Sequence, residues 1–157
     1  MALVVVVTSV GLAVNSFVVS RLTEGSAADL GVLQLRLAFN PGVAFSLGDQ
    51  LPSWAILAVA GFITLALAGY AVHVAPDAGV AGRIGFAAVL GGALTNLIDR
   101  AADGVVTDYF HTGWFPTFNL ADTFITIGVV LIVLDVLRQE WSAPRDAEGI
   151  EPSRELA

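Results

Sequence analysis

The stretch FNLADTFITIGVVLIVLDVL, residues 118–137, is nearly all apolar and is about long enough to cross a bilayer as a helix. It also carries a carboxylate, Asp122, inside its first turns. Ionisable groups at membrane depth are costly and usually face a protein interior. The stretch therefore predicts a membrane-spanning helix with a functional group near its start.

The composition of the whole chain is that of an integral membrane protein. Of its 157 residues, 56% are hydrophobic and 13% are charged, and the mean hydropathy is +0.80. Cysteine is absent, which excludes disulfides, thiol nucleophiles and Cys-ligated metals. The net charge of −7, without a clustered basic face, argues against nucleic acid as a partner.

Three further segments qualify as spans or come close. With the opening stretch, the predicted spans are residues 2–19, 53–75, 84–100 and 118–138. We expect an all-α membrane protein, a four-transmembrane-helix bundle forming a single domain over residues 1–157, with a flexible cytoplasmic tail from about 141. The first span is alternatively a cleaved signal peptide, and whether Met1 is the true start stays open.

The connections between the spans differ in length, and the two longer ones contain the segments that are predicted to form strands. The two longer ones, about 20–52 and 101–117, lie on the side opposite the termini. Within them LQLRLAF (33–39) and GVVTDYF (104–110) alternate apolar and polar residues, which predicts a small extracytoplasmic β-sheet at the membrane surface. The Arg distribution favours cytoplasmic termini only weakly, with four Arg on their side against three opposite.

Two polar motifs lie on the side of the predicted sheet. NPGVAF, residues 40–45, is a turn signal that presents Asn40 to an extended peptide, or is an ordinary tight turn. GGALTNLIDR, residues 91–100, begins with small residues that let another helix approach closely. Its Asn96, Asp99 and Arg100 share one helical face, where Asp99 is either a supporting group or the partner of Arg100 in a local ion pair.

A third motif holds two carboxylates. VVTDYFHTGWFPTFNLAD, residues 105–122, contains Asp108 and Asp122, which can meet if the intervening loop folds back, and Asn119 shares the helical face of Asp122. Two carboxylates in one poorly solvated site cannot both ionise easily, so one holds a proton and the pair supplies an acid and a base. The sequence leaves open which of them is protonated. Alone, Asp122 is alternatively a buried group satisfied by Asn96 or Thr95.

The remaining polar residues favour structural roles. His73 and His111 are expected to be interfacial or structural, and too few ligands converge for a metal site. Asp135 is expected to be solvated or paired with Arg138. Three Trp residues are expected to be interfacial anchors at span ends: Trp54, Trp114 and Trp141.

Together the motifs NPGVAF, GGALTNLIDR, VVTDYF and FNLAD, in this order, resemble the lipoprotein signal peptidases, also called signal peptidase II, a family of bacterial membrane aspartic proteases. The match runs from about residue 40 to 125. The resemblance implies that Asp108 and Asp122 are the catalytic pair. It assigns site-supporting roles to Asn40, Asn96, Asp99, Arg100 and Asn119.

The resemblance also implies a fold, a substrate and a location. The family has four transmembrane helices, cytoplasmic termini and an active site at the outer surface of the bacterial inner membrane. Its members remove the signal peptide from diacylglyceryl-modified prolipoproteins, cleaving before the lipidated Cys, with no metal or organic cofactor. The expected partners are therefore these prolipoproteins and membrane lipid, and we expect a monomer.

Two departures from the family pattern stand out. Thr95 replaces a usual Gly, which affects helix packing or polar contacts beside Asn96. In the first span the family commonly shows an Asp-Gln pair followed by a Lys, where this chain has Asn15, Ser16 and Val19. Two other functions stay open: a proton-coupled small transporter using Asp122 and Asp99, and an inactive homologue acting as a membrane scaffold or lipoprotein-binding module.

Overall fold

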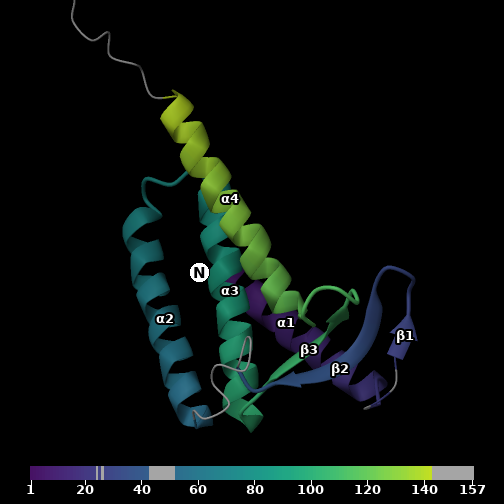
Figure 1. Cartoon of the computed structure of the whole chain (residues 1–157). Coiled ribbons are helices and arrows are strands. Elements are labelled where there is room, and N and C mark those ends of the chain that lie inside the picture. The colour runs from purple at the N-terminus through teal and green to yellow at the C-terminus, as the bar shows by residue number, and fades with distance from the viewer. Residues whose placement is uncertain (24, 26, 43–51, 143–157) are drawn as a thin grey trace, which may run out of the picture.

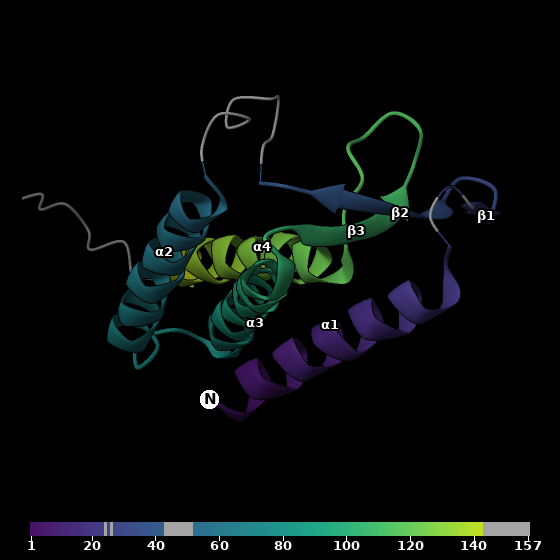
Figure 2. The same cartoon turned by 90° about the horizontal axis from the view of Figure 1, so that it is seen from below.

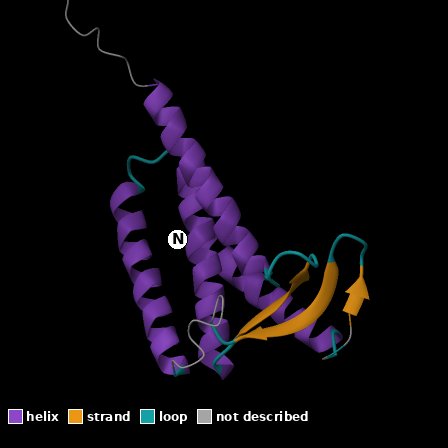
Figure 3. Cartoon of the chain, in the orientation of Figure 1, coloured by secondary structure: helices purple, strands orange, loops and turns teal. Residues whose placement is uncertain are grey.

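A computed structural model describes residues 1–142 apart from 24, 26 and 43–51. This part of the chain forms four helices and one small three-stranded sheet, which lies at one end of the helices (Figures 1 and 3). The helices are α1 (Ala2–Arg21), α2 (Ser53–Val74), α3 (Val80–Asp103) and α4 (Leu120–Ser142). The strands are β1 (Ala27–Asp29), β2 (Gln34–Asn40) and β3 (Val106–His111).

All four helices are long and apolar enough to cross a membrane, which confirms the predicted bundle. Helix α3 extends beyond the predicted span 84–100 at both ends, because hydropathy detects only the part of a helix that crosses hydrocarbon. At its start the Arg83 side chain donates to the loop carbonyls of Ala75, Pro76 and Ala78. Its end is set by Gly104, which adopts a left-handed φ of 91° that terminates helices.

The end of α4 overlaps the start of the predicted tail. Trp141 and Ser142, assigned to a flexible tail from about residue 141, are the last residues of α4. A helix does not end where its hydrocarbon crossing ends, so the polar residues that follow the span simply extend it. The rest of the predicted tail, residues 143–157, lies outside the described residues.

The central helix of the bundle is α3, with the other three helices around it when the molecule is viewed from below (Figure 2). Small residues allow the close approach. A Cβ built on Gly92 lies 2.5 Å from the carbonyl oxygen of Ala121 on α4, and one built on Gly91 lies equally near Val7 on α1. The prediction that the start of GGALTNLIDR packs against other helices is therefore confirmed.

Thr95, the unusual residue in that motif, is accommodated by a glycine on the neighbouring helix. Its side chain is fully buried, and its hydroxyl donates to the carbonyl of Gly91, 2.8 Å away. A Cβ built on Gly11 of α1 lies 2.7 Å from the Thr95 hydroxyl oxygen. Gly11 thus provides the space that the Thr95 side chain occupies.

The sheet has the antiparallel order β1-β2-β3. Its two longer strands are those predicted from alternation, with Ala38 paired to Asp108 and Asn40 paired to Val106. The short strand β1 was not predicted, because its three residues Ala27–Asp29 are all exposed and show no alternation. Figure 1 shows α1 and α3 running toward the sheet and α2 and α4 running away from it, so α3 and α4 meet beside β3.

The far end of the bundle is closed by Asp135, for which the sequence prediction was wrong. Asp135 is neither solvated nor paired with Arg138: it is buried, and its carboxylate accepts from the backbone N–H of Gly79 (2.9 Å) and from the Gln139 side chain (2.7 Å). Gly79 immediately precedes α3. Free N–H groups at a helix start need acceptors, and here the acceptor comes from α4.

Candidate active site

The site begins with two reciprocal hydrogen bonds at the start of α4. Asn119, the residue before the helix, accepts from the backbone N–H of Asp122 through its side-chain oxygen (3.0 Å). In return the Asp122 carboxylate accepts from the backbone N–H of Asn119 (3.0 Å). This is the capping box of a helix N-terminus, with an acid at the third helical position. It fixes the Asp122 carboxylate beside the first turn of α4.

The side-chain amide of Asn119 joins α4 to two other elements. It is fully buried, and it donates to Asp108 Oδ1 (3.0 Å) and to the carbonyl of Thr107 (3.3 Å), both on β3, as well as to Asn96 Oδ1 on α3 (3.0 Å). Asn119 therefore contacts the Asp108 carboxylate directly while it caps the helix that carries Asp122.

Both carboxylates accept from a second amide. Asn40, at the end of β2, donates to Asp108 Oδ2 (3.2 Å), and Asn96 donates to Asp122 Oδ1 (2.8 Å). Asp108 is buried, with 3% of its surface exposed. Of the two alternatives for satisfying Asp122, Asn96 is correct and Thr95 is not. Residues far apart in sequence thus converge on one pair of acids.

Electrostatics make the Asp108 carboxyl unusual. Burial, followed by the nearby charge of Asp122, raises the pKa of Asp108 from 3.8 to about 7. The hydrogen bonds from Asn40 and Asn119 act in the opposite direction, because they favour the ionised form. Near neutral pH this carboxyl therefore holds a proton for a substantial part of the time.

Asp99 and Arg100 support the site through the backbone of the strands that carry Asp108 and Asn40. Asp99 Oδ2 accepts from the backbone N–H of Thr107 (2.7 Å), the residue before Asp108. The Arg100 side chain donates to the carbonyl of Asn40 (3.3 Å) and lies within electrostatic reach of Asp108 and Asp122. The one helical face predicted for these residues thus serves separate partners: Asn96 contacts α4, Asp99 contacts β3, and Arg100 contacts β2.

Tyr109 belongs to the site but was not identified from the sequence. It is fully buried, and its hydroxyl oxygen accepts from the backbone N–H of Leu120, the first residue of α4 (3.1 Å). Burial raises the pKa of this hydroxyl. No local pattern marks this contact, because the N–H from which it accepts belongs to another element, 11 residues away.

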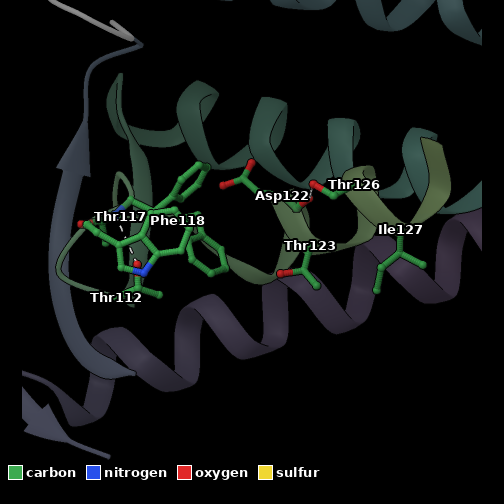
Figure 4. Close-up of a pocket in the computed structure, with 9 residues that line it drawn as sticks. Thr112, Thr117, Phe118, Asp122, Thr123, Thr126 and Ile127 are labelled. Carbon is green, nitrogen blue, oxygen red and sulfur yellow. Dashed lines mark hydrogen bonds between the residues drawn. The ribbon is translucent and has the colours of Figure 1, made fainter. Parts of the chain in front are cut away.

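An apolar cavity of about 580 Å³ opens beside Asp122. In Figure 4 Asp122, Thr126 and Ile127 follow one another along α4, while Thr112, Thr117 and Phe118 approach from the preceding loop. Trp114 and Phe115 complete the aromatic side of the cavity. The surroundings suit an apolar ligand held against a carboxylate.

His111, which was expected to be interfacial or structural, has a local partner. His111 Nδ1 lies 3.3 Å from the hydroxyl of Thr117, within the same loop region. Within the described part of the chain, no cluster of three or more His, Cys, Asp or Glu side chains has a geometry that could hold a metal ion.

Comparisons with known proteins agree with one another. The family model described as "Signal peptidase (SPase) II" matches residues 3–138. A protein of Brucella ovis named lipoprotein signal peptidase is 43% identical over 131 residues, covering 78% of this chain and 79% of its own. One of Mesorhizobium japonicum, with the same name, is also 43% identical, over 109 residues that cover 67% of this chain and 64% of that protein.

Two solved structures share the fold. A bacterial membrane enzyme determined by the in meso method at 2.3 Å resolution superposes with a TM-score of 0.76, at 24% identity, covering 94% of this chain and 92% of that one. A second, at 1.9 Å resolution, gives a TM-score of 0.73 at 24% identity, over 87% and 91% of the two chains. The family model spans most of the sequence and includes every residue of the site, and on that ground the chain belongs to the signal peptidase II family.

Proposed function

We propose that this chain is an aspartic endopeptidase whose catalytic pair is Asp108 and Asp122. One observation carries the proposal: a single buried residue, Asn119, donates to both carboxylates, from its side-chain amide to Asp108 and from its backbone N–H to Asp122. Asp122 in turn lines an apolar cavity. Family membership supports the removal of signal peptides from lipoprotein precursors. The assignment of the chemistry to these two carboxylates is our inference from the geometry.

The two acids take different roles in the proposed reaction. Because its pKa is about 7, Asp108 holds the shared proton and polarises the scissile carbonyl by donating to its oxygen. Asp122 acts as the base and removes a proton from the attacking water. The water oxygen bonds to the carbonyl carbon, and the tetrahedral intermediate collapses when the leaving amide nitrogen takes a proton from the pair.

The supporting residues hold this pair rather than react. Asn40 and Asn96 each donate to one carboxylate, and Asn119 fixes the relative positions of the two. Asp99 holds the β3 backbone beside Asp108, and Arg100 offsets the negative charge of the acids. Catalysis depends on such positioning, because an acid displaced by about 1 Å costs on the order of 100-fold in rate.

The substrate we propose is a prolipoprotein whose Cys carries a diacylglyceryl group, cleaved just before that Cys. The named relatives are lipoprotein signal peptidases. The apolar cavity beside Asp122 supports this choice, because both an acyl chain and a signal-peptide segment are apolar. A carboxylate in the first turn of a spanning helix can reach a bond that lies close to lipid.

For the orientation, we propose a multi-pass protein of the bacterial inner membrane, acting as a monomer. The termini are then cytoplasmic, and the sheet and the acid pair lie at the outer face. The alternation of helix directions supports this orientation, because the start of α1 and the end of α4 lie on the side away from the sheet (Figure 1). The transporter and scaffold alternatives are not favoured by the family to which the chain belongs.

The test uses the full chain purified in detergent and a lipidated precursor. Asp108→Asn and Asp122→Asn are each expected to give folded protein without detectable cleavage. Asp29→Asn, which removes an exposed acid from β1, is the matched control and should retain full activity. Full activity in either site variant would contradict the assignment of Asp108 and Asp122 as the catalytic pair. A chelator should cause no loss of activity.

A further inference from the structure

Another cavity, of about 240 Å³, lies between α1, the end of α3 and the sheet, and Thr107 of β3 is part of its lining. It shares no lining residue with the cavity beside Asp122. Its polar lining includes Asn15 from α1 and both Asp99 and Asp103 from α3. The proposed cleavage reaction makes no use of this space.

Asn15 is the least satisfied side chain of this cavity. Only 3% of its surface is exposed, and both its amide nitrogen and its amide oxygen are buried without a hydrogen-bond partner. A buried polar group left unpaired costs about 1–3 kcal/mol. The unpaired amide oxygen of Asn15 indicates that a hydrogen-bond donor from outside the described chain reaches it.

The charge of the lining shows what kind of group fits. Asp99 and Asp103 each use one carboxylate oxygen for a backbone N–H, of Thr107 and of Val105 respectively. In the described residues their other oxygens accept no hydrogen bond. The cavity is lined by no Lys, Arg or His, and the nearby Arg100 donates elsewhere, to the carbonyl of Asn40. A negatively charged, acceptor-rich space of this kind favours a cation that carries hydrogen-bond donors.

The position in the fold identifies the source of that cation. Asn15 and Val19 lie in the last turns of α1, and Asp103 is the last residue of α3, so the cavity lies where spanning helices leave the hydrocarbon. Val19 and Phe39, which also line it, are each nearly half exposed. They form an exposed apolar border of the cavity.

We propose that this cavity binds the primary ammonium group of an aminophospholipid. The three N–H donors of the ammonium match the free carboxylate oxygens of Asp99 and Asp103 and the amide oxygen of Asn15. The lipid tails then lie against the half-exposed side chains of Val19 and Phe39. This cavity is distinct from the one beside Asp122, and the binding proposal does not rest on the proposed peptidase activity. Its occupant neutralises Asp99, the residue that holds the strand beside Asp108.

The first test measures lipid binding by the delipidated full chain in detergent, using native mass spectrometry and thermal unfolding. Phosphatidylethanolamine is expected to bind and to raise the unfolding temperature. Phosphatidylcholine with the same acyl chains is the matched control, since its quaternary ammonium has no N–H donor. Equal binding of the two lipids overturns the proposal. Stabilisation by free ethanolamine equal to that by the lipid at the same concentration overturns the lipid as the source.

Variants locate the site. Asp103→Asn is expected to weaken phosphatidylethanolamine binding by about tenfold, the loss of one charge-assisted hydrogen bond. Asp29→Asn, the same change at an exposed acid outside the cavity, should not alter binding. Val19→Lys places an ammonium group of the protein itself in the cavity, one turn after Asn15. This variant should unfold at a higher temperature without lipid, and added lipid should no longer raise its unfolding temperature. Unchanged lipid binding in Asp103→Asn or Val19→Lys overturns the assignment to this cavity.

Discussion

Asn119 and Asp122 exchange two hydrogen bonds of 3.0 Å, each side chain accepting from the backbone N–H of the other residue. The same two residues that begin α4 therefore also set the place of one proposed catalytic carboxylate. Because the Asn119 amide also donates to Asp108, helix capping and assembly of the acid pair depend on one side chain.

Substitutions of Asn119 separate these two roles. Asn119→Ser keeps an oxygen that can cap α4, whereas Asn119→Ala does not, so the Ala variant should be less stable than the Ser variant by about 1 kcal/mol. Neither can bridge β3 and α3, so both should lose on the order of 100-fold in cleavage rate. Thermal unfolding in detergent and the cleavage assay measure the two effects. Full activity in the Ser variant contradicts a positioning role for the amide.

The raised pKa of Asp108 gives stability and activity a defined pH dependence. Between the ordinary pKa of 3.8 and about 7 the folded protein holds a proton that the unfolded chain releases, so this group's contribution to stability declines as pH rises through that window. Asp108→Asn removes the dependence. The difference in unfolding temperature, variant minus wild type, should therefore increase from about pH 4 to about pH 7 and then level off.

The rate of cleavage should depend on the same proton of Asp108. Above about pH 7 the pair loses its shared proton, and the rate should decline because no acid remains to polarise the carbonyl. Asp29→Asn, as the control, should reproduce the wild-type profiles of both rate and unfolding. A rate that keeps rising through pH 8 speaks against Asp108 as the protonated member.

Local sequence patterns predicted the features that depend on residues close together in the chain, which are the membrane spans and the two longer strands. Apolar runs predict the four spans, because only helices satisfy their backbone groups in lipid. Alternation predicts β2 and β3, and the spacing of Asn119 and Asp122 places them on one face. The motifs also named the groups that converge on the acid pair, although only the resemblance to a family assigned their roles.

Tertiary contacts determine what the sequence could not predict. The use of Asn119 by both acids depends on how the loop of residues 112–117 returns the chain to the bundle, and no periodicity reports that path. Asp135 was interpreted as solvated because its partner, the N–H of Gly79, is 56 residues away. The fit between Thr95 and Gly11 likewise lies between two helices that the sequence does not align.

That fit makes a double-mutant prediction. Gly11→Ala places a methyl group against the Thr95 side chain and should destabilise the protein by about 1–3 kcal/mol, the usual cost of overpacking. Thr95→Ala removes the obstructing atoms, so the double variant should recover most of that loss, giving a coupling well above the error of additivity. Gly69→Ala on α2 is the control, because a Cβ there meets nothing within 4 Å. Additive losses in the double variant contradict the proposed contact.

Substitutions of Asp135, at the opposite end of the bundle, test whether this carboxylate caps α3 or takes part in proton transfer. Asp135→Ala removes the acceptor for the Gly79 N–H and should lower stability by about 1–2 kcal/mol. Asp135→Asn, which keeps one acceptor oxygen, should lose less, and Glu140→Gln, an exposed acid on the same helix, should lose nothing measurable. Asp135 lies 13 residues from Asp122, about 20 Å along α4, so cleavage by the folded fraction at low temperature should be unchanged. If Asp135→Ala instead abolishes cleavage in fully folded protein, the two acids are coupled along the helix, and a path for protons through the membrane becomes the better account of both.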